Sequence, residues 1–170
     1  ANIVPFLNMK RLGVEIDYVK NSNGDILLSD IESLITPRTK LLSISFVQFL
    51  SGFKSDLASI GELCTRNNII FCVDAIQGVG STPIDVRGSS IDFLSCGTHK
   101  WLLSMTGLGF IYLTEKLQSQ LDQQFFGWMS NKHSFTNFFD YRLDPADSAR
   151  RYEIGTQNNA GIVALGESAS

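Results

Sequence analysis

The stretch from Lys40 to Ala75 most constrains the fold, because a helical pattern lies there between two apolar strand patterns. The runs "KLLSISFV" (40–47) and "IIFCVDA" (69–75) are short and apolar, as buried strands are. Between them, "SDLASIGELCTRNN" (55–68) has apolar residues at helical spacing, a Ser-Asp start and an Asn-Asn stop. A strand–helix–strand unit needs a right-handed crossover and a parallel strand pair. The sequence therefore predicts an α/β fold with a parallel sheet covered on both faces.

The rest of the chain continues this alternation less regularly. Further elements are predicted as strands at 14–19, 91–97 and 107–113 and a short helix with a Ser or Asp cap at 29–35. The segment 114–157 is aromatic and charged without a clear period, so we expect loops and short elements there. A helical pattern begins at Asn158 or Asn159 and has no stop signal before Ser170.

Length, composition and charge exclude several classes of protein. A chain of 170 residues with 44% apolar and 18% charged residues can bury the core of one domain. The formal charge of −3 and the lack of a basic run argue against a nucleic-acid partner. No apolar stretch reaches the roughly 18 residues of a membrane span, and the opening lacks the features of a signal peptide. We therefore expect no membrane partner.

The cysteines and histidines do not form a recognisable metal or disulfide pattern. Cys64, Cys72 and Cys96 contain no C-x-x-C pair and are odd in number, which favours free thiols in a reducing cytoplasm. Cys96 lies inside an apolar strand, which is typical of a core residue. His99 and His133 lack a second ligand at metal spacing, so no metal site is predicted. The sequence also lacks a phosphate-binding loop and a G-x-S-x-G nucleophile motif.

Asp74 and Lys100 follow two successive strands of the predicted sheet. Open α/β sheets bind ligands at the carboxyl ends of their strands, so both residues are predicted at the ligand edge. Each alone has an ordinary interpretation: Asp74 as the cap of the following turn, and Lys100 as a side chain extending to solvent. Together, a carboxylate and an amine would face one cleft. A cofactor with one cationic and one electrophilic atom could bind there.

Three motifs in order carry a resemblance to a known family. The segments "VDAIQG" (73–78), "GTHKWL" (97–102) and "RYEIGTQN" (151–158) resemble the landmarks of class V aminotransferases. These are pyridoxal-phosphate (PLP) enzymes of fold type I, and they include cysteine desulfurases and selenocysteine lyases. The segments "ANIVPF", "VQFLSGFKSDLASIGELC" and "TGLGFIYL" are similar to the same family, so the resemblance covers nearly the whole chain. A lone His-Lys pair is weak evidence, whereas the ordered set is specific.

The resemblance implies a three-layer α/β sandwich with a mainly parallel mixed sheet, the large domain of a fold type I PLP transferase. Residues 1–170 are expected to form most of that domain and to be truncated at both ends, since residue 1 is alanine. A ring-stacking residue and a phosphate loop would then precede Ala1. The substrate-carboxylate Arg and any mobile catalytic Cys would follow Ser170.

The resemblance also implies roles for individual residues around the cofactor ring. Lys100 would form the Schiff base with the cofactor and later move the proton at the substrate α-carbon. Asp74 would keep the pyridine nitrogen protonated, which makes the ring an electron sink. Gln77 would bond the phenolic oxygen of the ring, and Ala75 would lie against one ring face.

The phosphate group is expected to be held from two protomers. Thr98 and His99 would bind it from one side, and His99 is also counted among the catalytic residues. Thr156 would reach it from the neighbouring subunit, which implies a homodimer. The chain departs from the family pattern at Gly97, where many relatives have Ser, and at Phe49, where desulfurase-like relatives often have Asn.

The function implied is that of a cytoplasmic PLP-dependent transferase or lyase acting on a small amino acid. Cysteine desulfurase, selenocysteine lyase and aminotransferase chemistry fit the motifs equally. Two alternatives stay open: an epimerase or kynureninase-like PLP enzyme, and a non-catalytic α/β binding domain in which Lys100 pairs with a carboxylate.

Overall fold

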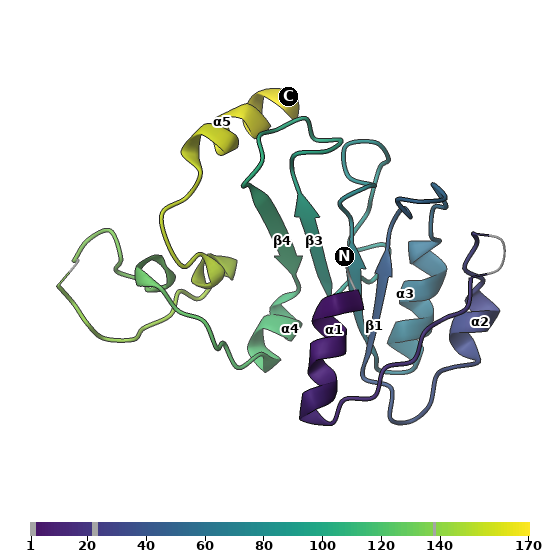
Figure 1. Ribbon diagram of the computed structural model, residues 1–170. Helices are drawn as coiled ribbons and strands as arrows, with labels where there is room; N and C mark the ends of the chain where they lie inside the picture. Colours follow the sequence, from purple (N-terminus) through teal and green to yellow (C-terminus); the bar gives the residue numbers. More distant parts are fainter. Residues whose placement is uncertain (1–2, 22–23, 138) are drawn as a thin grey trace.

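The computed structural model describes residues 3–21, 24–137 and 139–170 (Figure 1). Ala1, Asn2 and Phe138, which belong to segments considered above, lie outside the described residues. Within the described part, the strands form a mixed sheet in the order β1-β2-β3-β4. Their bounds are Leu41–Ser45, Ile70–Asp74, Phe93–Gly97 and Gly109–Leu113. The first three strands are parallel and β4 is antiparallel to β3, so the predicted parallel pair and the mainly parallel mixed sheet are confirmed.

Helix α3 (Leu57–Arg66) covers one face of this sheet. Its buried residues are the predicted apolar stripe: Leu57, Ile60, Gly61, Leu63 and Cys64. Asp56 caps the helix by accepting a hydrogen bond from the Ser59 N–H at 3.2 Å, as one of the two predicted starts required. On β2, Phe71 and Val73 are buried, whereas Cys72 and Asp74 alternate with them and are half-buried. Side-chain alternation along a strand thus puts Asp74 on the face opposite the main core.

Helix α2 (Leu28–Glu32) confirms the predicted short helix but not its cap. The helix begins after Leu27, which makes no side-chain capping bond, and both Ser29 and Asp30 lie inside it. The predicted strand at 14–19 is wrong, because the structure assigns no strand to these residues. The apolar pattern there reflects partial burial of Ile16 and Val19, and an apolar pattern alone does not supply a neighbouring strand to pair with.

The remaining helices are short. Their bounds are Ile3–Met9 (α1), Lys10–Leu12 (η1), Glu115–Gln120 (α4), Trp128–Ser130 (η2), Ala149–Tyr152 (η3) and Asn159–Ser168 (α5). The expectation of loops and short elements over 114–157 is confirmed, and α5 begins where predicted, with Asn158 as its cap. Helix α5 ends at Ser168 although no stop signal was recognised. No described helix is long and apolar enough to cross a bilayer.

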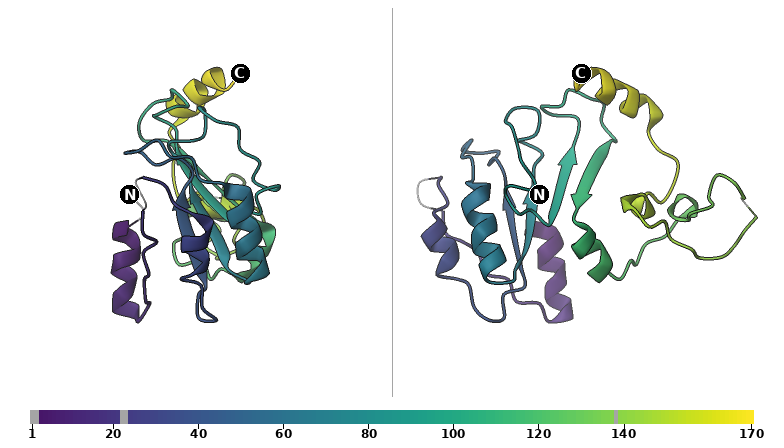
Figure 2. Two further views of the ribbon diagram at one scale, coloured as in Figure 1. Left: turned by 90° about the vertical axis from the view of Figure 1, so that its right-hand side faces the viewer. Right: turned by 180° about the vertical axis from the view of Figure 1, so that it is seen from behind.

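The layers are visible from the side. Helices α1 and α3 lie on opposite sides of the sheet (Figure 2). No residue of α1 is buried, so this helix adds little to the core. Helix α5 lies beyond the carboxyl end of β3 (Figure 1), which places it at the edge where the ligand site was predicted.

Candidate active site at the carboxyl edge of the sheet

Asp74 is the last residue of β2, and it lies between two serines on neighbouring strands. The register pairs Asp74 with Ser45 of β1 and with Ser95 of β3. Its Oδ1 accepts a hydrogen bond from the Ile76 N–H at 3.1 Å, so the carboxylate does cap the following turn. Among the described residues, no hydrogen bond or ion pair engages the second oxygen, which leaves Asp74 able to bind a cation at the same time.

Lys100 lies in the turn that follows β3, at the same edge of the sheet. The turn is closed by backbone bonds from Ser104 N to Thr98 O at 3.1 Å and from Leu103 N to Lys100 O at 3.0 Å. Lys100 is half-buried. The salt bridges found among the described residues do not include it. Among the described residues the Lys100 amine is therefore not held in an ion pair with a carboxylate.

Thr98 and His99 have different surroundings despite being adjacent. Thr98 is fully buried, and its hydroxyl donates to the Leu108 carbonyl at 3.1 Å, which ties the end of β3 to the loop before β4. His99 is exposed, and its ring lies against Gly97. A Cβ at position 97 would lie 3.0 Å from Ile76 Cδ1 and 3.2 Å from His99 Cε1. A side chain at position 97 would therefore require the Ile76 and His99 side chains to shift by a few tenths of an ångström.

Ala75 and Ile76 follow Asp74 where β2 ends and the next turn begins. Ala75 has no exposed surface and belongs to the hydrophobic core. Ile76 is half-buried in the turn; its N–H donates to Asp74 Oδ1 at 3.1 Å, and its Cδ1 lies next to Gly97. Ile76 is therefore a neighbour of both strand ends that the sequence analysis did not single out.

Gln77 is joined to a second residue that the sequence analysis did not single out. The indole Nε1 of Trp101 donates to Gln77 Oε1 at 3.2 Å. Trp101 directly follows Lys100, so this bond links the turn after β2 to the turn after β3. Asp74, Gln77, His99 and Lys100 thus come together at one edge.

Thr156 and Phe49 lie in other surroundings. Thr156 is exposed in the segment between η3 and α5, and no described contact joins it to the other candidate residues. Phe49 is 77% exposed in the turn after β1. Helix α5 itself is fixed beside the Lys100 turn, since Ser168 Oγ donates to Leu102 O at 2.6 Å and Ser104 Oγ donates to Gly161 O at 2.9 Å.

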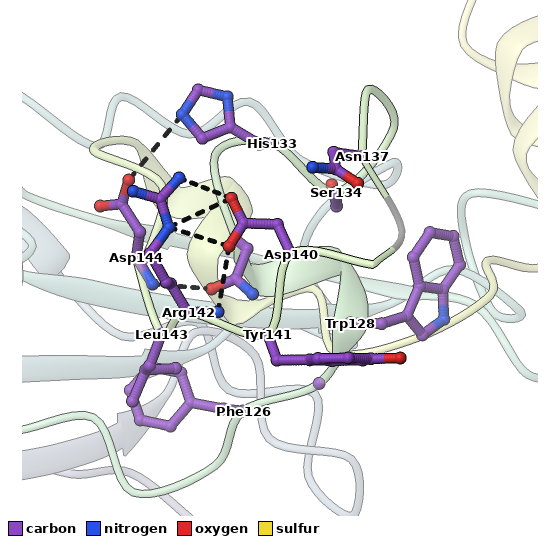
Figure 3. A pocket seen from close by; sticks show the side chains of 12 residues that line it. Phe126, Trp128, His133, Ser134, Asn137, Asp140, Tyr141, Arg142, Leu143 and Asp144 are labelled. Carbon is purple, nitrogen blue, oxygen red and sulfur yellow. Dashed lines mark hydrogen bonds and ion pairs between the residues drawn. The ribbon is translucent and has the colours of Figure 1, made fainter.

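A separate cavity of about 370 Å³ lies in the irregular segment before η3 (Figure 3). Its lining includes Trp128, Tyr141 and His133, and it shares no residue with the strand edge. Its charged groups are already paired: the Arg142 guanidinium donates to Asp140, and His133 lies 3.9 Å from Asp144. The described residues contain no group of His, Cys, Asp or Glu that could hold a metal ion. The chemistry therefore points to the strand edge and not to this larger cavity.

Comparison with known proteins agrees with the motifs. A family model described as aminotransferase class-V matches residues 1–170. The chain belongs to the aminotransferase class V family. Its resemblance to this family, predicted from the three motifs, is confirmed.

Individual class V relatives were compared as well. A probable cysteine desulfurase of Borreliella burgdorferi is 35% identical over 169 residues, which cover 98% of this chain and 40% of the relative. The apo structure of a cysteine desulfurase from Thermococcus onnurineus NA1 has a TM-score of 0.85 at 25% identity, over 98% of this chain and 41% of that one. A C-DES variant with glycine covalently linked to its PLP cofactor has a TM-score of 0.75 at 22% identity, over 82% and 37%.

These likenesses fix the fold of this class V chain. The mixed α/β sheet is that of PLP-dependent enzymes of fold type I, as predicted. The chain spans 40% of the length of the Borreliella relative and 41% of the Thermococcus structure.

Proposed function

We propose that this chain forms part of a PLP-dependent enzyme that acts on a small amino acid, with Lys100 as the residue that binds the cofactor covalently. The observation that carries the proposal is the arrangement at the carboxyl edge. Lys100 lies there without a carboxylate partner among the described residues, beside the strand that ends in Asp74. Membership of the class V family supports the same assignment.

The donor set fits the chemistry of PLP. Asp74 offers a free carboxylate oxygen to a protonated pyridine nitrogen, and the Gln77 amide offers N–H donors to a phenolic oxygen. Lys100 offers an amine to a carbonyl carbon. When bound, PLP supplies an electron sink for negative charge that develops at the substrate α-carbon.

The chain's own residues then divide the work. Asp74 holds the proton on the pyridine nitrogen, because a carboxylate beside a cation favours the charged form. Ile76, whose Cδ1 lies next to Gly97, limits the space at the end of β3. The Lys100 amine lies at the sheet edge, where it would move the proton at the substrate α-carbon once it is released from the cofactor. His99, exposed beside Gly97, is the available contact for phosphate from this protomer, since Thr98 is buried and bonded.

Among the reactions open to this family, cysteine desulfuration is the first to test, because the Borreliella and Thermococcus relatives are described as cysteine desulfurases. Transamination is the second candidate. A desulfurase needs a reactive thiolate, and burial raises the pKa of Cys64 to about 12 and of Cys72 and Cys96 to about 11. The thiol that accepts sulfur would therefore be none of these three.

The proposal includes the wider setting. Residues 1–170 form most of a large domain, the active unit is a homodimer with Thr156 reaching the neighbouring site, and the protein works in the cytoplasm. The dimer is supported by the exposure of Thr156, and the compartment by cysteines that are free of disulfides.

The decisive experiment is covalent trapping of the cofactor. The full chain is mixed with PLP, its visible absorbance is recorded, and the complex is reduced with borohydride and mapped by peptide mass. We expect a yellow, borohydride-sensitive complex with the cofactor fixed on Lys100. Lys100→Ala should abolish the band, whereas Lys116→Ala, which changes an exposed lysine of α4, should not. A band that survives in Lys100→Ala would refute the assignment.

The candidate reactions are distinguished by the product formed from each substrate. Sulfide released from cysteine would indicate desulfuration, and keto acid formed from alanine in the presence of an acceptor keto acid would indicate transamination. Retention of the band with neither product would point to the remaining reactions: epimerisation, measured by loss of optical rotation, selenide release from selenocysteine, or kynureninase-like cleavage of the substrate side chain.

A further inference from the structure

The contact between Trp101 and Gln77 has a chemical consequence for the orientation of the glutamine amide. Trp101 Nε1 donates to Gln77 Oε1 at 3.2 Å. An indole N–H can only donate, so its partner must be the carbonyl oxygen of the amide and not the amino group. The amide is thereby held in one of its two flipped orientations. Its NH₂ group points away from the indole.

The NH₂ group of Gln77 is free to serve another acceptor. Among the described residues, no hydrogen bond uses Nε2 of Gln77, although the residue is half-buried. The acceptor side of the amide is occupied and its donor side is open. Gln77 Nε2 is therefore an available donor at this edge, whereas Oε1 already accepts from the indole.

Backbone packing holds the two turns in this relation. Gly80 adopts φ +92°, and a Cβ there would lie 2.6 Å from the carbonyl carbon and oxygen of Trp101. Gly78 packs on the buried Phe46 ring, since a Cβ there would lie 2.0 Å from Cδ1. Both glycines let the turn after β2 pack directly on its neighbours. The close approach of Gly80 to the Trp101 carbonyl thus joins the two turns at the backbone, in addition to the bond between the indole and the amide.

We propose that Trp101 is a positioning residue that fixes the Gln77 amide so that its NH₂ group donates to the phenolic oxygen of the bound cofactor. This inference rests on the proposed function. Trp101 does not touch the reacting atoms; it acts through Gln77. Without the indole, the amide can turn over and present its oxygen to an electron-rich partner, which is repulsive.

The measurable consequence is the pH midpoint of the visible cofactor band. A donor to the phenolic oxygen withdraws electron density from it, which weakens its hold on the proton shared with the Lys100 nitrogen. Loss of that donor therefore raises the midpoint. For one hydrogen bond we expect a rise of about 0.5–1 pH unit in Gln77→Leu and a smaller rise in Trp101→Phe.

The test is a double-mutant cycle on the PLP-loaded full chain. If Trp101 acts through Gln77, the double variant should have the midpoint of Gln77→Leu alone, because no amide remains to be oriented. Trp128→Phe, which removes the only other indole, should leave the midpoint unchanged. An unchanged midpoint in Trp101→Phe, or additive shifts in the double variant, would overturn the proposal.

A second measurement needs no cofactor. The chain has two tryptophans, so its NMR spectrum contains two indole N–H signals. The spectrum of Trp128→Phe shows which of the two belongs to Trp101. Gln77→Leu should shift one indole signal, that of Trp101, and leave the other in place; no shift would show that the bond is absent in solution. The pH midpoint can be measured only if the wild-type chain shows the cofactor band. A wild-type chain without that band refutes the proposed function. A normal band whose midpoint does not change in Trp101→Phe refutes this inference alone.

Discussion

At the scale of single residues, Asp74 combines two tasks that its two carboxylate oxygens keep separate. One oxygen caps the turn by accepting from the Ile76 N–H, and the other remains for a cation. Asparagine can still accept through one oxygen, so Asp74→Asn should keep the turn but lose the charge. We expect turnover of amino acids to fall by roughly 10²–10³, as for removal of one preorganised electrostatic group, with an unchanged unfolding midpoint.

The matched control for Asp74→Asn is Asp85→Asn. Asp85 caps its own turn by accepting from the N–H groups of Arg87 and Gly88 at 3.0 and 2.9 Å, but it does not end a strand at the candidate site. Asp85→Asn should leave the turnover of amino acids unchanged. Wild-type turnover by Asp74→Asn would show that Asp74 only caps its turn and has no role in the reaction.

The cysteines give a prediction with a defined pH dependence. Burial raises the pKa of Cys64 to about 12 and that of Cys72 and Cys96 to about 11. At pH 8, roughly one thiol in 10³ or fewer is then a thiolate, so the folded chain should react slowly with a thiol reagent. The rate should keep rising through pH 9 instead of levelling near the ordinary cysteine pKa. Rapid reaction of any thiol at pH 8 without denaturant would contradict this.

Part of the candidate site could be predicted from the sequence, and its residues show why the rest could not. Asp74 and Lys100 were found because a charge at the end of an apolar strand is visible in the sequence. The full burial of Thr98 and the partial burial of Ile76 depend on how the neighbouring segments pack, and that is a tertiary property. The Trp101–Gln77 bond joins residues 24 positions apart, so no local pattern could reveal it.

At the scale of elements, two glycines inside helices allow the effect of packing on stability to be measured separately from the effect of helix propensity. In α3, a Cβ on Gly61 would lie 1.9 Å from the Ser89 carbonyl oxygen, which belongs to the backbone. In α5, a Cβ on Gly166 would meet nothing within 4 Å. Gly61→Ala should therefore lower the free energy of unfolding by about 1–3 kcal/mol despite the better helix former.

Gly166→Ala is the matched control within the same chain. Because the site is open, alanine should stabilise α5 by roughly 0.5–1 kcal/mol through its helix propensity alone. Urea unfolding of both variants measures the difference. Equal effects of the two substitutions would show that α3 does not pack on the 85–90 turn as described.

The elements themselves were predictable where local and tertiary preferences agree. The helix 57–66 and the strands beside it combine periodicity, caps and burial, and they were found within a few residues of their ends. The segment 14–19 was predicted as a strand but pairs as a strand with none of the described residues, and pairing cannot be read from one segment alone. Loops and short elements were expected over 114–157 and are present, but the cavity in this segment was not expected.

At the scale of the whole molecule, the candidate site is incomplete within one folded edge. Asp74, Gln77, His99 and Lys100 gather at the sheet, whereas Thr156 lies exposed on the segment that leads into α5, without a described contact to them. The Thr156 hydroxyl is exposed, so it is accessible to a second protomer in the proposed homodimer. If the homodimer exists, each cofactor site draws Lys100 from one protomer and Thr156 from the other.

That arrangement predicts complementation between two defective chains. Thr156→Val should weaken PLP binding about tenfold, as expected for loss of one hydrogen bond to a charged group, and Lys100→Ala should abolish the visible band. In a mixed dimer of the two variants, one site contains the intact Lys100 of the Thr156→Val chain and the intact Thr156 of the Lys100→Ala chain.

Differently tagged chains, refolded together and purified through both tags, should regain the band with wild-type affinity at one of the two sites. In the control mixture, Lys100→Ala with Gln77→Leu, both changes lie at the same edge, so the one site that keeps Lys100 lacks Gln77 and should show the raised pH midpoint of Gln77→Leu and not the wild-type midpoint. A mixed dimer of Lys100→Ala and Thr156→Val that binds PLP no better than Thr156→Val itself, or a chain that is monomeric by mass yet binds PLP tightly, would place Thr156 outside the neighbouring site.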